Sequence, residues 1–240
     1  MLSIIVPTLN EENHLPSLLR SIKRQGFSDC QIIVADAGSK DRTSEIARRY
    51  NCKIVPGGSP ARGRNSGARV AKGNLLLFLD ADVVLPEGFL EKGLKEFKRK
   101  KLQIATFRLL PQRNDKAIHL LFDLCYNLPV FFMQKTLAHA AMGILIEKEL
   151  FEKIRGFDET IKIAEDHDLA RRAEKIGRYG VIRSTELFVS ERRFEKEGWF
   201  RTAMKYLLCG AYMLFKGPIR KDTFEYKFSH YSKDKENEIK

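Results

Sequence analysis

The sequence is poor in cysteine, and its cysteines form no recognisable site. Four are spread over 240 residues, with no CxxC pair and no histidine at the spacing of a zinc site. This pattern argues against a zinc-binding module and against a disulfide-rich secreted scaffold. We expect free thiols in a reducing compartment.

Long uncharged hydrophobic runs are also missing. The apolar run at residues 2–6 is short, and it has neither the basic segment nor the small-residue cleavage site of a signal peptide. No stretch reaches the ~18–20 uncharged apolar residues that a membrane-spanning helix needs. We therefore expect a cytoplasmic protein that does not cross a membrane.

Negative charge is in deficit, since 31 Asp and Glu residues face 43 Lys and Arg residues and leave a net charge of +12. Such a charge indicates an anionic partner: nucleic acid, an anionic membrane surface or a phosphorylated substrate. The sequence contains neither an aromatic-rich basic RNA motif nor a compact helix-turn-helix pattern. We therefore expect no nucleic acid as partner, and the other two classes remain.

Strand and helix patterns alternate through the first hundred residues. The sequence predicts strands at residues 2–6, 30–36, 52–56 and 74–80, and helices at residues 13–25, 43–50, 62–72 and 87–100. The strands are continuous apolar runs, which indicates that both faces of the sheet are covered. This predicts an α/β fold with an open sheet and right-handed crossovers. Such sheets bind ligands at the carboxyl ends of their strands.

The second half of the chain is less regular. We predict a strand at residues 104–109, an apolar segment at 117–133, a strand at 140–146, and helices at 148–154, 165–176 and 199–215. The tail from residue 216 is charged and nearly free of aliphatic residues, so we expect it to be mobile.

Two carboxylates directly follow the most apolar strand. Asp80 and Asp82 stand one residue apart, and residues i and i+2 of an extended segment point to the same side. Together they could bind a hard divalent cation that keeps some waters and takes diphosphate oxygens as further ligands. Alone, the pair is equally compatible with a polar turn at a strand end.

A third acidic residue, Asp36, ends the second predicted strand and precedes a turn at Gly38 and Ser39. A carboxylate at this position can accept hydrogen bonds from a base or a ribose. The structural alternative is that Asp41 or Thr43 caps the helix that follows. Asp36 lies too early to be that cap, so both roles can coexist.

Three segments carry a family resemblance: IIVPTLNEE (4–12), VADAGSKDRT (34–43) and LLLFLDADVVLP (75–86). In this order and spacing they resemble the family-2 glycosyltransferases of GT-A fold. GFDE and AEDHDLARR (164–172) resemble that family's acceptor-side segment, and the resemblance covers about residues 2–195. It implies a three-layer α/β/α sandwich with a mainly parallel sheet. It also implies an inverting transferase that uses a nucleotide diphosphate sugar of UDP or GDP type, with Mn²⁺ or Mg²⁺.

On the donor side, the resemblance implies that Pro7, Thr8 and Glu11 line the nucleoside pocket and that Asp36 holds the base or the ribose. All four stand at or after the ends of the first two predicted strands. A ligand of an open α/β sheet binds at such strand ends, so the expectation from the fold and the implication of the resemblance agree.

At the reacting centre, the resemblance implies that Asp82 ligates the metal, while Asp80 contacts the ribose or a metal-bound water. Asp166 would deprotonate the acceptor as it attacks the anomeric carbon, with Glu165 as its neighbour. The metal would stabilise the diphosphate leaving group, and one-step displacement would invert the anomeric centre. Without the resemblance, Glu165 and Asp166 would simply be favourable charges at a helix N-terminus.

Four arginines are candidates for the diphosphate. Arg62 and Arg64 stand at a predicted helix start, where a cation opposes the helix dipole and so needs another reason to be there. Arg192 and Arg193 follow a strand-like stretch and resemble the basic pair that meets the diphosphate in related transferases. Guanidinium groups suit phosphate oxygens. A solvated surface position is the alternative for each pair. Three histidines are further candidates for the metal shell: His119, His139 and His167.

Two apolar segments, 117–133 and 199–215, approach the length of a spanning helix. They are either core or dimer-interface helices, or helices that lie in a membrane interface with basic flanks. The second alternative makes the protein peripheral to the membrane and its acceptor lipid-linked, such as a polyprenyl phosphate or a glycolipid. The expected divisions are a transferase domain at 1–198, with a nucleotide half (1–100) and an acceptor half (101–198), an apolar helix at 199–215 and a charged tail at 216–240.

Other functions fit the sequence less well. A sugar-phosphate nucleotidyltransferase has a similar sheet, but it would open with a Gly-rich phosphate loop, and PTLNEE contains no glycine. A soluble glycosyltransferase with a non-lipid acceptor would differ only in the role of the two apolar segments. A catalytically inactive relative is disfavoured because Asp36, Asp80, Asp82 and Asp166 are all present.

Overall fold

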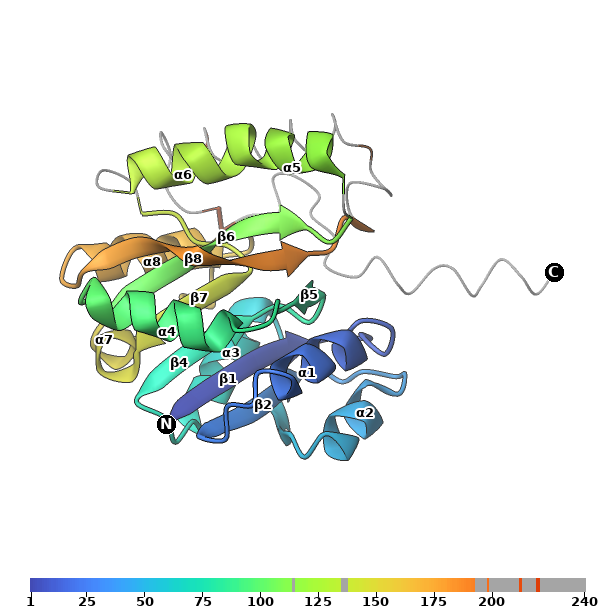
Figure 1. Ribbon diagram of the computed structural model, residues 1–240. Coiled ribbons are helices and arrows are strands. Elements are labelled where there is room, and N and C mark those ends of the chain that lie inside the picture. Colours follow the sequence, from blue (N-terminus) through green and yellow to red (C-terminus); the bar gives the residue numbers. More distant parts are fainter. Residues whose placement is uncertain (114, 135–137, 193–197, 199–211, 213–218, 221–240) are drawn as a thin grey trace.

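The structure is a computed structural model, and it describes residues 1–113, 115–134, 138–192, 198, 212, 219 and 220. The described strands form one mixed sheet in the order β3-β2-β1-β4-β7-β6-β8-β5 (Figure 1). Their bounds are β1 (Leu2–Thr8), β2 (Cys30–Asp36), β3 (Lys53–Pro56), β4 (Leu75–Leu79), β5 (Val83–Val84), β6 (Ile104–Pro111), β7 (Gly143–Glu147) and β8 (Tyr179–Val189). Strands β3, β2, β1 and β4 run parallel, whereas β7 runs antiparallel to β4 and β6.

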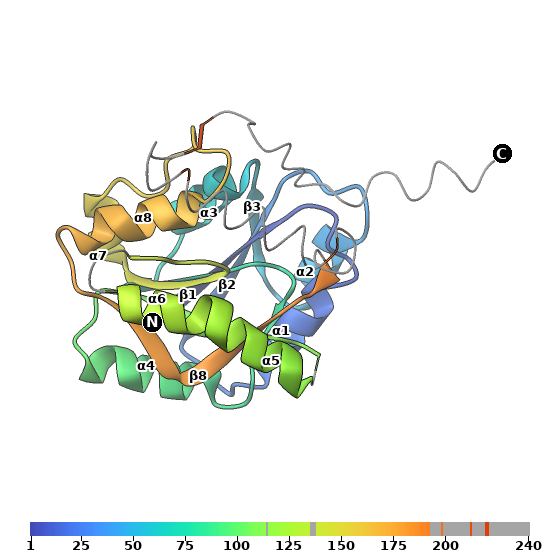
Figure 2. The same cartoon turned by 90° about the horizontal axis from the view of Figure 1, so that it is seen from above.

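Helices cover both faces of the sheet, as the continuous apolar strands predict. One face carries α1 (Leu15–Lys23), α2 (Thr43–Arg49) and α4 (Phe89–Arg99). The other face carries α3 (Pro60–Arg69), α7 (Lys148–Lys153) and α8 (Glu165–Glu174). Figure 2 shows the two helical layers with the sheet between them. The fold is therefore the expected three-layer α/β/α sandwich.

Successive residues of β1 point to opposite faces of the sheet. Ile4 and Val6 belong to the apolar cluster under α1 and α4, while Ile5 belongs to the cluster under α3. Helix α3 approaches β1 very closely, because a Cβ added to Gly67 would lie 2.4 Å from Cγ2 of Ile5. This packing fixes α3, and with it Arg64, against the sheet.

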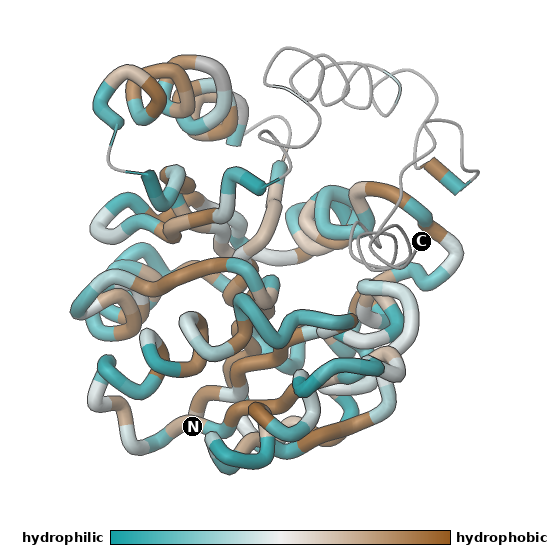
Figure 3. Tube along the Cα trace, turned by 90° about the vertical axis from the view of Figure 1, so that its right-hand side faces the viewer, coloured by the Kyte–Doolittle hydropathy of each residue, from teal (hydrophilic) through white to brown (hydrophobic). Residues whose placement is uncertain are grey.

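The apolar segment predicted at 117–133 forms an almost continuous helical rod. It consists of α5 (Lys116–Phe122), a π-helical turn η1 (Asp123–Asn127) and α6 (Leu128–Met133). The rod crosses over β6 and β8 (Figures 1 and 2), and hydrophobic residues recur along it (Figure 3). Asn127 anchors it to β6, since its side-chain amide exchanges two hydrogen bonds with the backbone of Leu109. In the described part of the chain, no helix is long and apolar enough to span a bilayer.

The sequence did not predict β5, and it indicated β8 only as a strand-like stretch before Arg192. Strand β8 carries charged residues at its centre, so its apolar pattern is weak. Its pairing with β6 shifts register between Phe107 and Arg108. Near this irregularity, the Glu96 carboxylate on α4 accepts the backbone N–H groups of Arg183 and Ser184. Tertiary contacts therefore stabilise a strand that local pattern does not reveal.

Apart from Tyr212, the predicted helix 199–215 lies outside the described residues, and so does most of the predicted tail. Within that tail, which the sequence predicts to be mobile, Ile219 and Arg220 are described. Ile219 is fully buried and forms a β-bridge with Ile163. Nη1 of Arg220 lies 3.0 Å from Oδ2 of Asp158. These two residues therefore pack against the segment that precedes α8.

Candidate functional site

The polar ends of β1, β2 and β4 lie at one edge of the sheet, as the sequence predicts. Thr8 stands opposite Asp36 in the register of β1 and β2, and each is the last residue of its strand. Thr8 Oγ1 donates a hydrogen bond of 3.3 Å to Asp36 Oδ1. Asp80 directly follows β4, and its backbone N–H donates to the carbonyl of Met142, which precedes β7. The motifs that the sequence analysis assigns to a donor side therefore meet at this edge.

Asp36 is held by the turn that follows it. Its carboxylate accepts hydrogen bonds from the backbone N–H and the hydroxyl of Ser39, and from Ser44 Oγ at 2.8 Å. Gly38 permits this turn with a φ of 87°. The carboxylate is fixed in place and stays half-buried, which suits a residue that receives a ribose or a base.

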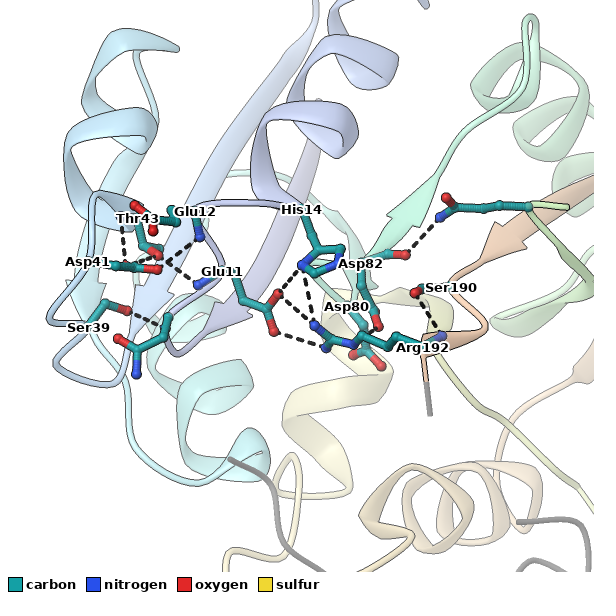
Figure 4. Close-up of polar contacts among 12 residues, drawn as sticks. Glu11, Glu12, His14, Ser39, Asp41, Thr43, Asp80, Asp82, Ser190 and Arg192 are labelled. Carbon is teal, nitrogen blue, oxygen red and sulfur yellow. Dashed lines mark hydrogen bonds and ion pairs between the residues drawn. The ribbon is translucent and has the colours of Figure 1, made fainter. Parts of the chain in front are cut away.

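Asp41 ties the loop after β1 to the start of α2 (Figure 4). Its Oδ1 accepts the N–H of Thr43 and its Oδ2 accepts the N–H of Glu12, each at 3.0 Å. Thr43 Oγ1 in turn accepts the N–H of Glu11 at 2.8 Å. The N-cap of α2 is Arg42, so the cap predicted at Asp41 or Thr43 is wrong in position. Asp41 nonetheless binds the first helical N–H group.

Arg192 joins the loop after β1 to the Asp80–Asp82 segment (Figure 4). Its Nη1 and Nη2 each lie 3.0 Å from an oxygen of Glu11, so the guanidinium binds that carboxylate in a bidentate manner. Its Nε lies 2.9 Å from Oδ2 of Asp82. Burial raises the pKa of Asp82 to about 6; Arg192 opposes this shift, and Asp80 adds to it. The predicted metal ligand is therefore held by an arginine of the same chain.

His14 belongs to the same cluster, although it is not among the site residues predicted from the sequence. Its Nδ1 lies 3.1 Å from Oε2 of Glu11. Burial alone would raise the pKa of Glu11, but hydrogen bonds from His14 and Arg192 lower it below its ordinary value. A signal existed in the sequence, because His14 stands three residues after Glu11 at the start of α1, and residues at that spacing are neighbours around a helix.

Arg64 links the Asp80–Asp82 segment to the start of α8. Its Nη2 lies 2.7 Å from Oδ1 of Asp80, and its Nη1 donates to Oε1 of Glu165 at the start of α8. Arg64 and Glu165 are each 6% exposed. Arg64 is therefore not a solvated surface residue, which was the alternative expected from the sequence. The close approach of α3 to β1 buries its guanidinium between Asp80 and Glu165. Glu165 is engaged by this pair and positions the first turn of α8.

Asp166, the predicted base, follows Glu165 on the first turn of α8. Its Oδ1 accepts the backbone N–H of His167 at 3.0 Å. Burial raises the pKa of Asp166 to about 6; Arg64 opposes this shift, and Asp80 adds to it. Asp166 lies near the Asp80–Asp82 segment, because Arg64 contacts both Asp80 and Glu165, the residue that precedes Asp166. A carboxylate with this pKa is ionised at neutral pH and basic enough to accept a proton.

The three histidines do not complete a metal shell. His139 and His167 stack with ring centroids 3.7 Å apart, and burial lowers their pKa values to about 2 and about 3. His119 lies on α5, where its Nε2 is 2.8 Å from the carbonyl oxygen of Arg113. Within the described ranges, no three His, Cys, Asp or Glu residues are grouped to hold a metal ion.

The donor set nevertheless fits a hard divalent cation that brings its own remaining ligands. Asp80 and Asp82 supply carboxylate oxygens, and the guanidinium of Arg192 shows that positive charge is stabilised beside Asp82. Mg²⁺ and related ions use one or two carboxylates and complete their shells with waters and substrate phosphates. The two carboxylates therefore suit Mn²⁺ or Mg²⁺ that arrives with a diphosphate.

The remaining arginine candidates for the diphosphate are Arg62 and Arg193. Arg62 lies on the first turn of α3, where its side chain is exposed and packs beside Gly58. Arg193 lies outside the described residues. Pro7 is half-buried under α3, where it approaches Gly63.

Comparisons with known proteins agree with the motifs. Residues 3–153 match the model of the family described as glycosyl transferase family 2. The chain is 29% identical over 184 residues to the uncharacterized glycosyltransferase EpsJ of Bacillus subtilis (strain 168), which covers 69% of this chain and 54% of EpsJ.

Solved structures show the same fold. TarS of S. aureus in complex with UDP-GlcNAc superposes with a TM-score of 0.65 at 22% identity, over 79% of this chain and 58% of that one. The mannosyltransferase PcManGT of Pyrobaculum calidifontis in complex with GDP-Man and Mn²⁺ gives a TM-score of 0.64 at 21% identity, over 78% and 56%. The chain thus spans less than two thirds of the length of each of these proteins.

Proposed function

The chain belongs to glycosyl transferase family 2, and from this membership we propose that it transfers a sugar from a nucleotide diphosphate sugar to an acceptor, with inversion at the anomeric carbon. The observation that supports the proposal most directly is that one arginine connects the proposed metal ligands to the helix turn that carries the proposed base. Arg64 pairs with both Asp80 and Glu165, so the proposed metal motif and the proposed base motif lie on either side of one buried guanidinium.

The proposed donor is a UDP or GDP sugar with Mn²⁺ or Mg²⁺. TarS binds UDP-GlcNAc, and PcManGT binds GDP-Man and Mn²⁺, which supports a donor of this class. Thr8 and Asp36 would receive the nucleoside, Pro7 and Glu11 would line its pocket, and Asp82 with Asp80 would hold the cation. When bound, the cation supplies positive charge to the oxygens of the leaving diphosphate. Arg192 is placed to add a guanidinium. Arg62, which is exposed, stays a candidate for the same role, and so does Arg193, which lies outside the described residues.

Asp166 is the proposed general base. Its carboxylate would take the proton of the acceptor hydroxyl while the acceptor oxygen attacks the anomeric carbon and the bond to the diphosphate breaks. The proton then rests on Asp166, and the electron pair leaves with the diphosphate. Glu165 would not touch the substrate; held by Arg64, it would orient the helix turn that presents Asp166.

We propose a cytoplasmic protein peripheral to the membrane, with a lipid-linked acceptor. An exposed apolar stripe on the α5–η1–α6 rod supports this. Its members are large hydrophobic residues, with Phe132 as much as 75% exposed: Leu120, Leu121, Leu124, Leu128 and Phe132. The stripe lies in the acceptor half, and the net charge of +12 favours anionic headgroups. A soluble transferase with a non-lipid acceptor is the alternative.

Flotation with anionic liposomes at low and high salt separates these two proposals. We expect the native protein to float at both salt concentrations, because buried apolar side chains are not screened by salt. Replacing Leu124 and Phe132 by Ser should abolish flotation at high salt. Ile176→Ser is the matched control, since Ile176 is 50% exposed just after α8 and outside the rod. Absence of flotation at either salt would favour the non-lipid acceptor.

The donor proposal is tested by calorimetry of UDP and GDP with and without Mn²⁺. We expect Mn²⁺ to tighten nucleotide binding in the native protein and to have no such effect in Asp82→Asn. Asp29→Asn is the control, since Asp29 is exposed and precedes β2 at the opposite edge of the sheet. Equal nucleotide affinity with and without Mn²⁺ in the native protein would contradict the proposed metal dependence.

A further inference from the structure

Arg192 occupies the place where a cation is expected. Its guanidinium contacts Asp82 Oδ2 at 2.9 Å and both oxygens of Glu11 at 3.0 Å. The Asp82 side chain is only 17% exposed, and its Oδ2 is the atom that the guanidinium covers. We infer that Arg192 is the resident counter-ion of the proposed metal site and that nucleotide diphosphate and metal displace it together, an inference that rests on the proposed function.

The proposed metal ligands and Glu11 are already paired with arginines of the protein itself. Arg64 pairs with Asp80, and Arg192 pairs with Asp82 and with Glu11. A divalent cation that binds Asp82 must therefore remove the guanidinium or sit beside it, where like charges repel. The metal ion alone consequently binds this site weakly.

Arg192 is placed so that it can change partners. It lies beyond Val189, the last residue of β8, and no ladder pairing holds it; its backbone N–H donates to Ser190 Oγ at 3.3 Å. Its side chain is 27% exposed, so solvent and ligands can reach it. Two diphosphate oxygens offer a guanidinium the same two-pronged geometry that the Glu11 carboxylate offers. A diphosphate can therefore draw Arg192 away and free Asp82 for the cation.

Coupling between the two ligands follows from this exchange. The nucleotide removes the guanidinium that competes with the metal, so each ligand raises the affinity of the other by the same factor. Metal-first binding is disfavoured, because the metal would take Asp82 from Arg192 and leave the guanidinium with Glu11 as its anionic partner but with no replacement for Asp82. The arrangement makes joint occupancy the favourable state.

The test measures binding of Mn²⁺ without nucleotide, by electron paramagnetic resonance of the free ion, in the native protein and in Arg192→Gln. Gln is polar and uncharged, so Asp82 and Glu11 lose their counter-ion. We expect R192Q to bind Mn²⁺ alone at least about tenfold more tightly than the native protein, since a buried carboxylate without a counter-ion is unfavourable and a bound cation relieves this cost. The same variant should bind UDP or GDP alone at least about tenfold more weakly than the native protein, because the bidentate, charge-assisted hydrogen bonds from the guanidinium to the diphosphate are lost.

Arg42→Gln is the matched control, because Arg42 lies at the same edge, is exposed and pairs with Glu12. It should bind Mn²⁺ as the native protein does. Circular dichroism checks that each variant is folded. Arg192→Lys keeps the positive charge but cannot form the bidentate contact, so its affinity for Mn²⁺ alone should lie between those of the native protein and R192Q. Equal or weaker Mn²⁺ binding in R192Q would overturn the inference. If the native protein binds neither UDP nor GDP with Mn²⁺, the proposed donor is wrong, while the metal-only comparison still decides the role of Arg192.

Discussion

Removal of Arg64 should cost more stability than removal of a surface arginine. Arg64 and Glu165 are each 6% exposed, and the pair joins α3 to α8. Arg64→Met introduces an apolar side chain of similar length, so the main change is the loss of charge. The Glu165 carboxylate then stays buried without the guanidinium, whereas Asp80, which is 32% exposed at its side chain, can be hydrated.

The size of the effect follows from two limits. Breaking a buried ion pair from one side costs about 3–5 kcal/mol. If Glu165 takes up a proton at pH 7 instead, an ordinary pKa of about 4.3 and 1.36 kcal/mol per unit set the cost at about 3.7 kcal/mol. Burial raises the pKa of Glu165 and Arg64 opposes this, so the variant has the higher pKa. The folded variant then keeps a proton that the unfolded chain releases, and its deficit shrinks to about 1 kcal/mol near pH 5.

Urea unfolding at pH 7 and pH 5 measures this prediction. Arg62→Met on the same helix is the control; Arg62 is exposed, so its free energy of unfolding should change by less than about 0.5 kcal/mol. The double variant Arg64→Met/Glu165→Gln should recover part of the loss, since the side chain at position 165 then carries no charge. An R64M variant that is no less stable than R62M at pH 7, or whose loss of stability is the same at both pH values, would contradict this prediction.

Three further predictions concern the base, its titration and the packing of α3. Asp166→Asn should keep donor affinity and lower turnover by about 10²–10⁴ in a product-formation assay; retention of more than about a tenth of native turnover would move the base role to another residue. In the native protein kcat should rise as pH increases through about 6, because burial raises the pKa of Asp166 to about 6 and only the ionised form accepts a proton; a flat profile would contradict this. Gly67→Ala should lower the free energy of unfolding, measured in urea, by about 1–3 kcal/mol, because the added Cβ would lie 2.4 Å from Ile5. Unchanged stability would mean that α3 can shift away from β1 at little cost.

The acidic residues at the sheet edge could be predicted from sequence because each follows an apolar run that ends abruptly. Asp36 and Asp80 mark the ends of strands, and parallel strands present their carboxyl ends at a common edge. Asp82 follows from the i, i+2 spacing. The assignment of Asp166 came from the resemblance, because local pattern alone explains it as helix N-terminal charge.

The roles of the arginines could not be predicted in the same way. Arg64 pairs with a residue 101 positions away in the sequence, so only the packing of α3 against β1 reveals that the guanidinium is buried. Arg192 pairs with Glu11 across 181 positions. Helix-dipole reasoning indicated that arginines at the start of α3 need a partner, but it could not say that the partners are the two carboxylates on either side.

Ile219 bears on how far the chain can be shortened. Its carbonyl accepts the N–H of Lys162 at 2.9 Å, and its side chain is buried with Ile163, next to the residue that begins the turn into α8. A truncation after residue 198 would expose the Ile163 patch and remove this tether. Burial of an isoleucine contributes about 1.5–3 kcal/mol, so the segment before Asp166 would open more often. Limited proteolysis of the truncated protein should therefore cut this segment first, while the β1–β2 end of the sheet, which the tether does not touch, stays resistant.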